Sequence, residues 1–323
     1  MKAILWTAYG APSVLQPGEV EKPSPRENEV LVRVHASSVT TGDCEMRRLK
    51  LPLFFSFPMR LYAGFDRPRR ITILGQELAG EVEAAGSAVK RFKPGDPVYG
   101  TTTLQLGAYA EYICVPEEML APRPSNLTYE QAAAIPLGGQ ESLYYLRKAG
   151  LRSGQKVLVY GAGGSIGTVA VQLARSYGAE VTAVDRASKL DMLRSIGAAH
   201  VIDHTQEDFT QSNVIYDVIF DVVGKSPFPR SLQCIREGGY YLIANPGLSH
   251  ILRSPLASRK SRKKIIYGKS EQKGEDLFQL TEMIEAGKIT PVIDRIYPLE
   301  QTAEAHAYVE TGEKKGSVVI AIA

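Results

Sequence analysis

Short alternating stretches of apolar and polar residues dominate the first third of the chain. EVLVRVHASSV (29–39) and AYAEYICVP (108–116) alternate as half-buried strands do. FKPGDPVYG (92–100) predicts a turn followed by another short strand. Because short strands separated by frequent turns are typical of β-rich domains, we expect residues 1–124 to form a compact, partly open barrel.

The pattern changes after Pro124, where strand-like and helix-like stretches begin to alternate. KVLVYG (156–161) predicts a buried strand, and SIGTVAVQLARSYG (165–178) predicts a helix that ends at a glycine. EVTAVD (180–185) and KLDMLRSIG (189–197) repeat the strand and the helix. This alternation predicts an α/β fold in which helices cover a parallel sheet.

Two segments fit neither pattern. Residues 51–70 are rich in Phe, Pro and Arg, and we expect a loop that either packs on its own domain or forms an apolar wall beside a bulky substrate. The charge run SRKSRKK (258–264) either binds an anionic surface or lies in a solvated loop, and the sequence favours the solvated loop.

Composition narrows the function classes. The net charge of +3 over 323 residues argues against a dedicated nucleic-acid binder. Cys44, Cys114 and Cys234 lie too far apart for a disulfide framework or a CxxC zinc pattern, so we expect a reducing, cytoplasmic compartment. No run approaches the ~20 apolar residues of a membrane span, so we expect no membrane partner.

A cluster of small residues lies where the predicted strand 156–161 becomes a helix. Glycines at a strand-to-helix turn let backbone N–H groups approach a pyrophosphate, and the helix N-terminus adds partial positive charge. The spacing G-x-x-G-x-x-G is one residue longer than the usual dinucleotide motif, and ordinary turn glycines are the alternative. The predicted cofactor-binding residues of this turn are Gly161, Gly163, Gly164, Ser165, Ile166 and Gly167.

The end of the next predicted strand strengthens this interpretation. Asp185 follows the glycines by roughly 20 residues, where an acidic group binds ribose hydroxyls. A carboxylate there favours NADH, whereas Arg186 and Lys189 are able to hold the 2′-phosphate of NADPH unless they are surface cations. The cofactor is therefore NAD(P)H, and the choice between NADH and NADPH stays open.

Several longer stretches together resemble one enzyme superfamily. They are VTTGDCEMRR (39–48), ILGQELAGEVEAAGSAVKRFKPGDPVYG (73–100), GAYAEYICVP (107–116), AAAIPLGG (132–139), YGAGGSIGTVAVQLARSYGA (160–179), IGAAHVID (196–203) and ETGEKKGSVVI (310–320). Their order resembles the medium-chain dehydrogenase/reductase superfamily, in its zinc-independent quinone oxidoreductase and alkenal reductase branch. The resemblance implies a Rossmann doubly wound parallel sheet over residues 125–268 and a β-rich GroES-like catalytic domain over 1–124 and 269–323.

The resemblance also implies site residues. Thr40 and Asp43 match the segment that faces the nicotinamide, although Asp43 is alternatively a cap of the helix-like CEMRR stretch. Tyr62 is a candidate proton donor. Val222, Val223, Asn245 and Lys315 match segments that contact the cofactor, with a surface position as the alternative for Lys315.

Metal chemistry is not expected. In this superfamily the zinc alcohol dehydrogenases carry Cys and His where this chain has Thr40 and Gln76, and neither replacement offers the ligand that catalytic zinc prefers. The five histidines show no ligand spacing; they are His35, His200, His204, His250 and His306.

These features predict an NAD(P)H-dependent oxidoreductase that transfers hydride to quinones or α,β-unsaturated carbonyls, which are small electrophilic substrates. Two alternatives remain: an alcohol or carbonyl dehydrogenase of the same superfamily, and a non-catalytic nucleotide-binding regulator. The stretch KKIIYG (263–268) predicts an apolar strand, and in the family a strand here pairs across a two-fold axis, which implies a homodimer.

Overall fold

The computed structural model describes residues 1–49, 53–102, 105–268 and 274–322, and it forms two compact units. The first unit comprises Met1–Leu137, Gln272–Glu285 and Pro291–Ala323, and the second comprises Gly138–Glu271 and Ala286–Thr290. Residues 125–137 thus join the first unit, not the second as expected. The reason is that α3 (Tyr129–Ala133) packs on strands β3 and β4 of the first unit.

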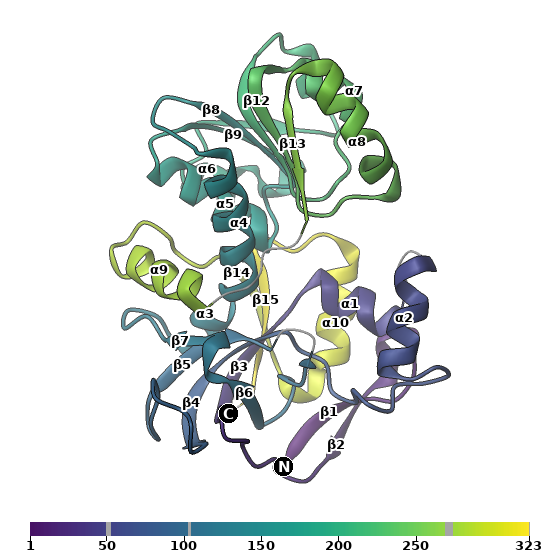
Figure 1. The fold of residues 1–323 in the computed structure, drawn as a ribbon, viewed down its shortest axis with the longest axis vertical. Helices are drawn as coiled ribbons and strands as arrows, with labels where there is room; N and C mark the ends of the chain where they lie inside the picture. The colour runs from purple at the N-terminus through teal and green to yellow at the C-terminus, as the bar shows by residue number, and fades with distance from the viewer. Residues whose placement is uncertain (50–52, 103–104, 269–273, 323) are drawn as a thin grey trace. The chain divides into compact units, whose positions relative to one another are not determined.

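The first unit is built around a seven-stranded sheet (Figure 1). Its order is β14 (Ile293–Pro298), β15 (Ser317–Ala321), β3 (Glu29–Val39), β4 (Glu77–Ala85), β5 (Pro97–Thr101) and β7 (Leu120–Pro122), with β6 (Tyr112–Pro116) paired to β3. All pairs are antiparallel except β14–β15. A separate antiparallel ribbon joins β1 (Lys2–Trp6) to β2 (Leu15–Glu19), which agrees with the short alternating pattern of the sequence.

Helices pack beside this sheet. Two of them, α1 (Thr41–Arg48) and α10 (Thr302–Thr311), lie side by side, and α9 (Gly274–Glu285) lies beside β7. Single turns of 3-10 helix occur at Pro12–Val14, Glu117–Met119 and Leu299–Gln301.

The loop expected over residues 51–70 is corrected in part, because α2 spans Leu53–Ala63. Met59, Tyr62 and Ala63 recur at helical spacing and pack on a core that contains Trp6. This amphipathic packing outweighs the helix-breaking tendency of Pro58. Residues 50–52 lie outside the described part of the chain.

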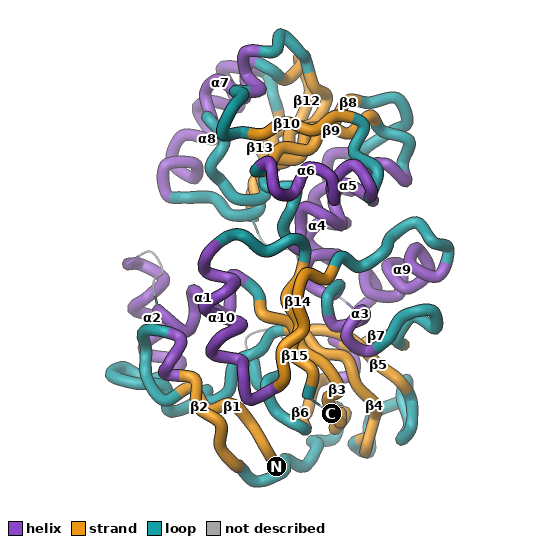
Figure 2. The backbone as a smooth tube through the Cα atoms, turned by 180° about the vertical axis from the view of Figure 1, so that it is seen from behind, coloured by secondary structure: helices purple, strands orange, loops and turns teal. Residues whose placement is uncertain are grey.

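The second unit contains a six-stranded, all-parallel sheet, drawn in orange in Figure 2. Its order is β10 (His200–Asp203), β9 (Glu180–Asp185), β8 (Lys156–Tyr160), β11 (Tyr216–Asp221), β12 (Ile235–Ile243) and β13 (Lys264–Tyr267). The strand that comes first, β8, lies in the middle, with β9 on one side and β11 on the other. This is the strand order of a doubly wound dinucleotide fold, so the α/β expectation is confirmed.

Helices flank this parallel sheet as the alternating pattern predicted. The helices are α4 (Pro136–Ala149), α5 (Ser165–Ser176), α6 (Leu190–Ser195), α7 (Phe228–Gln233) and α8 (Leu248–Ser261), with 3-10 turns at Ala187–Lys189 and Phe209–Gln211. Figure 2 shows α5 and α6 near β8 and β9, and α7 and α8 beside β12 and β13. The first half of SRKSRKK therefore ends a helix and does not form the expected loop. No helix in the described ranges is long and apolar enough to cross a membrane.

Candidate functional site

The glycine turn joins β8 to α5 at the carboxyl edge of the parallel sheet. Gly161 adopts a left-handed backbone with φ of +80°, and its N–H donates to the carbonyl of Val184 on β9 at 2.9 Å. Gly164 is the N-cap of α5, and no side chain caps this helix. The first N–H groups of α5 and the positive end of its dipole are therefore not used by a capping side chain.

The space around each glycine shows what the turn is built to admit. A Cβ at Gly167 would lie 2.5 Å from backbone atoms of Gly161 and Ala162, so this glycine permits close packing of helix and strand. A Cβ at Gly164 would meet only one atom within 4 Å, the carbonyl oxygen of Gly161 at 3.9 Å. Open space in front of an uncapped helix N-terminus is what a pyrophosphate requires, so the residues fit a dinucleotide.

Asp185 ends β9 and reaches back to the glycine turn. Its carboxylate accepts the N–H of Gly163 at 2.7 Å and pairs with the ammonium group of Lys189 at 3.3 Å. Both side chains are less than a tenth exposed. The structure thus brings three predicted residues together, Gly163, Asp185 and Lys189, and the ammonium group of Lys189 partly neutralises the Asp185 carboxylate. Arg186 lies at an exposed position next to them.

A second loop follows β11 and lies against the glycine turn. Val223 faces Gly161 closely, since a Cβ added there would lie 2.7 Å from the Val223 side chain. Asn245 donates its amide to the carbonyl of Val222 at 2.7 Å and so fixes this loop. The predicted residues of the second unit therefore form one cluster at the edge of the sheet.

Asp221 organises that loop, and the sequence did not single it out. Its buried carboxylate accepts backbone N–H groups of Gly224 at 2.8 Å, Lys225 at 3.3 Å and Ser226 at 2.9 Å. The hydroxyl of Tyr241 donates a fourth hydrogen bond at 3.0 Å. An aspartate that ends a buried strand immediately before a glycine-containing turn was the available signal.

In the first unit, Thr40 and Asp43 form a reciprocal cap at the start of α1. The Asp43 carboxylate accepts the Thr40 N–H at 2.9 Å and the Thr40 hydroxyl at 2.6 Å, while the Asp43 N–H donates to that hydroxyl oxygen. The Gln76 amide also donates to it, at 3.1 Å. Burial raises the pKa of Asp43, and the hydrogen bond from the Thr40 hydroxyl opposes that rise. Capping, the alternative weighed for Asp43, is the role that the geometry displays.

Glu77, next to Gln76, is a buried acid that the sequence reading passed over. It is 2% exposed, accepts the N–H of Leu137 at 2.7 Å and receives the hydroxyl of Ser38. Burial raises the pKa of this carboxyl to about 7. Its place on an inward-facing strand position among small apolar residues was the signal for burial.

Three further polar side chains in contact with one another lie next to this cap. Buried His306 contacts the thiol of Cys44 at 3.4 Å through Nδ1 and the hydroxyl of Tyr109 at 3.2 Å through Nε2. Burial lowers the pKa of His306 to about 3, so the ring is neutral at physiological pH. Among the residues that the structure describes, no group of three or more His, Cys, Asp or Glu side chains is placed to hold a metal ion.

Two predicted residues lie outside these clusters. Tyr62 is partly buried against the core of the first unit, and the guanidinium of Arg70 lies 4.9 Å from its ring centroid. Lys315 belongs to the first unit, where its N–H donates to Asp294 at 3.1 Å. Their catalytic and cofactor-binding roles stay predictions.

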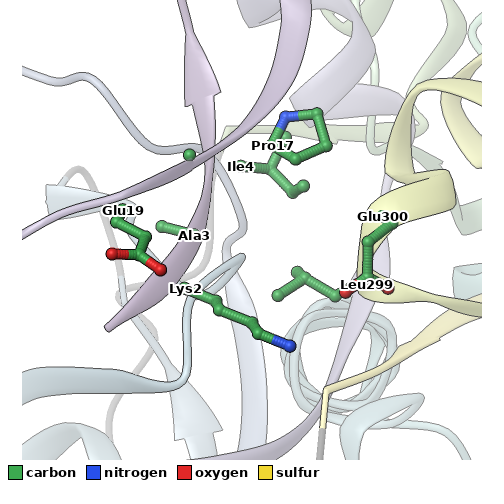
Figure 3. A pocket seen from close by; sticks show the side chains of 8 residues that line it. Lys2, Ala3, Ile4, Pro17, Glu19, Leu299 and Glu300 are labelled. Atoms are coloured by element: carbon green, nitrogen blue, oxygen red, sulfur yellow. The ribbon is translucent and has the colours of Figure 1, made fainter.

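A pocket of about 280 Å³ lies away from these residues, between the β1–β2 ribbon and the 3-10 turn at Leu299 (Figure 3). Figure 3 shows Lys2 and Glu19 on the ribbon and Glu300 on the turn. None of the predicted site residues lines this pocket, so it is not the candidate site.

Comparison with known proteins covers most of the chain. Residues 26–125 match the family described as alcohol dehydrogenase GroES-like domain, and residues 196–320 match the family described as zinc-binding dehydrogenase. A 2-methylene-furan-3-one reductase from Solanum lycopersicum is 33% identical over 337 residues, which cover 99% of this chain and 79% of the relative.

Quinone oxidoreductases are also similar to this chain. The enzyme from Pseudomonas aeruginosa is 31% identical over 343 residues and covers 99% of both chains. The solved structure of Escherichia coli quinone oxidoreductase complexed with NADPH has a TM-score of 0.84 and 26% identity, and covers 99% of this chain and 100% of that one.

Proposed function

The chain belongs to the medium-chain dehydrogenase/reductase superfamily, in its quinone oxidoreductase branch, and from this premise we propose that it transfers hydride from NAD(P)H to quinones or to α,β-unsaturated carbonyl compounds. The observation that carries the proposal is the uncapped N-terminus of α5 with open space at Gly164. Such a turn binds the pyrophosphate of a dinucleotide.

The residues of the second unit would hold the cofactor. Backbone N–H groups at the start of α5 bind the pyrophosphate, and Asp185 with Lys189 binds the adenosine ribose end. The Val222–Val223 loop, fixed by Asp221 and Asn245, supports the other side of the turn. When bound, the nicotinamide supplies the hydride.

We propose that the reaction needs no metal. The segment that carries ligands in zinc enzymes presents an alcohol and an amide, Thr40 and Gln76, which are poor zinc ligands, and they are hydrogen-bonded to each other. Conjugation already makes the reacting carbon of a quinone or enone electrophilic. Hydrogen-bond donors near the carbonyl oxygen then suffice to stabilise the developing charge.

Either form of the cofactor is compatible with the Asp185–Lys189 pair. The carboxylate favours ribose hydroxyls, whereas the ammonium group favours a 2′-phosphate.

We further propose a cytoplasmic homodimer. Its support is the edge strand β13, which pairs only with β12 among the described residues.

The test follows NADH and NADPH oxidation side by side with 1,4-benzoquinone, an alkenal and a simple alcohol–ketone pair, each with and without a chelator. Chelator-insensitive reduction of the quinone or alkenal is the expected result. Turnover of the alcohol pair alone would indicate an alcohol dehydrogenase. Cofactor binding without any turnover would indicate a nucleotide-binding regulator instead of an enzyme.

A further inference from the structure

Helix α8 presents its leucines to solvent. Leu248, Leu252 and Leu256 follow one another at intervals of four residues, and they are 53%, 71% and 60% exposed. Residues at this spacing share one face of a helix. A helix on a globular domain normally turns such a stripe toward the core, so this stripe is directed at something outside the unit.

The opposite face of α8 packs on the second unit: the ring of His250 lies edge-on to that of Phe228, 5.3 Å between centroids, and Ala257 packs against a core cluster of the unit. Ser254 is buried, at 2% exposure, and its hydroxyl donates to the carbonyl of His250 at 2.6 Å. The hydroxyl of Ser258 donates to the carbonyl of Lys263 at 2.7 Å. Both hydrogen bonds are local to α8 and its C-terminal turn, and the packing of His250 and Ala257 leaves the leucine stripe on the exposed face of the helix.

A groove of about 460 Å³ continues the stripe toward α7. Phe228 and Leu232 of α7 line it together with Leu252 and Leu256, and the charged groups at its rim are Arg253 and Lys263. The face of α8 is thus apolar at its centre and basic at its edge. We call Leu248, Leu252, Leu256, Arg253 and Arg259 the α8 face.

The charge around the α8 face is mainly positive, although one acid, Glu237, pairs at 3.9 Å with Arg262, the residue that follows the helix. The sequence from Gly238 to Ser270 contains seven Lys and Arg residues and no Asp or Glu. Arg253, Arg259 and Arg262 are exposed. Basic residues beside exposed leucines on one helix are the pattern of an interfacial helix, which buries its apolar stripe between lipid headgroups while its cations meet anionic lipids.

We propose that the α8 face binds the surface of membranes that contain anionic lipids. A second copy of the chain fits this face less well, because two-fold symmetry would bring the exposed Arg253 and Arg259 against the same cations of the copy. The homodimer proposed above uses the edge strand β13 instead of the α8 face. The proposal departs from two expectations of the sequence analysis: that the chain has no membrane partner, and that residues 258–264 lie in a solvated loop. It concerns binding to one surface of the bilayer, not a span through it.

One consequence rests on the proposed function. Quinones that carry apolar tails reside in membranes, so an enzyme held at the lipid surface meets them there. The α8 face then affects turnover of a vesicle-borne quinone and leaves turnover of water-soluble 1,4-benzoquinone unchanged. If the unaltered protein turned over neither quinone, the proposed function would be refuted. Vesicle binding is measured without cofactor or substrate, so it tests the membrane proposal separately.

The experiment is co-sedimentation of the full chain with vesicles of phosphatidylcholine, with and without phosphatidylglycerol. We expect binding only to the anionic vesicles, and less binding at high salt. Leu252→Ser/Leu256→Ser and Arg253→Gln/Arg259→Gln are each expected to weaken binding by roughly tenfold or more, because the first removes apolar surface that the headgroup region would cover and the second removes two cations that would meet anionic lipids.

Controls change exposed residues elsewhere in the molecule. Ile215→Ser/Ile296→Ser removes two exposed apolar side chains, and Arg152→Gln removes an exposed cation of the same unit; both are expected to bind as the unaltered protein does. Absence of binding to anionic vesicles, or equal loss in the controls, would overturn the proposal. A dimer that becomes a monomer by light scattering only in Leu252→Ser/Leu256→Ser would also overturn it, in favour of an interface between copies.

Discussion

Two strand-to-helix turns of this molecule differ in whether a side chain caps the first N–H groups of the helix. After β3, the N-terminus of α1 is closed by the reciprocal cap of Thr40 and Asp43. After β8, the N-terminus of α5 begins at Gly164 and has no side-chain cap. Both helices carry the same unsatisfied N–H groups and the same dipole. The chain caps them with side chains at one turn and has no side-chain cap at the other, where we propose that the pyrophosphate of the cofactor binds.

The largest expected effect comes from closing the open turn. Gly164→Val places a side chain in the space before α5, and Gly164→Asp adds a cap whose charge repels a pyrophosphate. Either change is expected to weaken dinucleotide binding by about a thousandfold, or about 4 kcal/mol. Titration of NADH and NADPH fluorescence measures this, and unchanged affinity in a folded variant would refute the pyrophosphate site.

Gly167→Ala is the control for this prediction. Its Cβ would meet backbone atoms at 2.5 Å, so the variant is expected to lose stability before it loses any specific contact with the ligand. Gly164→Val and Gly164→Asp should keep the unfolding midpoint of the unaltered protein, because nothing blocks their side chains. The two glycines therefore separate a fold requirement from a ligand requirement within one turn.

Buried acids lie around the closed turn, and one of them, Glu77, makes the stability of the fold depend on pH. Its pKa of about 7 in the folded protein lies above the ordinary 4.5. Between pH 4.5 and pH 7, Glu77 is therefore protonated in the folded protein and ionised in the unfolded protein. Its contribution to stability is complete below pH 4.5 and is lost as pH rises through 7. Glu77→Gln stays neutral, so we expect it to be more stable than the unaltered protein above pH 7, by roughly 3 kcal/mol.

Urea unfolding of both proteins over this pH range measures the difference. Other titrating groups, including His306, are shared by the two proteins and largely cancel in the comparison. The expected result is a gap that opens between pH 4.5 and 7. A gap of constant size would show that Glu77 is ionised throughout and that its burial does not shift its titration.

The same contrast explains what the sequence could and could not predict. The open turn depends on backbone shape, and backbone shape is encoded locally: glycines at fixed spacing and an acidic residue after the next strand identify Gly161, Gly164 and Asp185. The cap of the closed turn is equally local, because Thr40 and Asp43 lie three positions apart, but the polar cluster next to it depends on side chains that meet across long separations. His306 contacts Cys44 and Tyr109, which are 262 and 197 residues away in sequence, so no local pattern indicates the cluster.

Helix α2 and helix α8 were missed for a related reason. The composition of residues 51–70, rich in Phe, Pro and Arg, and the charge run 258–264 both favoured loops. Each helix does contain a proline, Pro58 in α2 and Pro255 in α8. Packing of one helix face decides the outcome in α2, where Met59 and Tyr62 contact the core. In α8 the side chains of His250 and Ala257 pack on the second unit.

The preference for NADH or NADPH is the next test of the open turn, and the expected change is smaller than the loss of binding in the Gly164 variants. Asp185→Ser removes the carboxylate that pairs with Lys189, so we expect preference to shift toward NADPH by about tenfold, or about 1.4 kcal/mol. Lys189→Gln is the matched opposite and should weaken NADPH more than NADH. The measurement is the ratio of kcat/KM for the two cofactors. Equal ratios in all three proteins would show that this pair does not contact the ribose.

The smallest expected effect compares two capped turns. Thr40 caps α1 and Thr128 caps α3, and each forms a reciprocal cap with the residue three positions later. Thr40→Ala and Thr128→Ala are each expected to lower stability by about 1 kcal/mol, because each leaves helix N–H groups without a side-chain acceptor. Thermal unfolding measures this shared cost.

Turnover separates the two threonines. If Thr40 only caps its helix, its variant behaves as Thr128→Ala does, with kcat/KM for 1,4-benzoquinone unchanged. If Thr40 also positions the substrate carbonyl, as the resemblance implies, only Thr40→Ala loses activity. Thr40→Ser then shows whether the hydroxyl or the methyl group of Thr40 matters, because serine keeps the hydroxyl that donates to Asp43 and accepts from Gln76. Activity restored by serine assigns the effect to that hydroxyl.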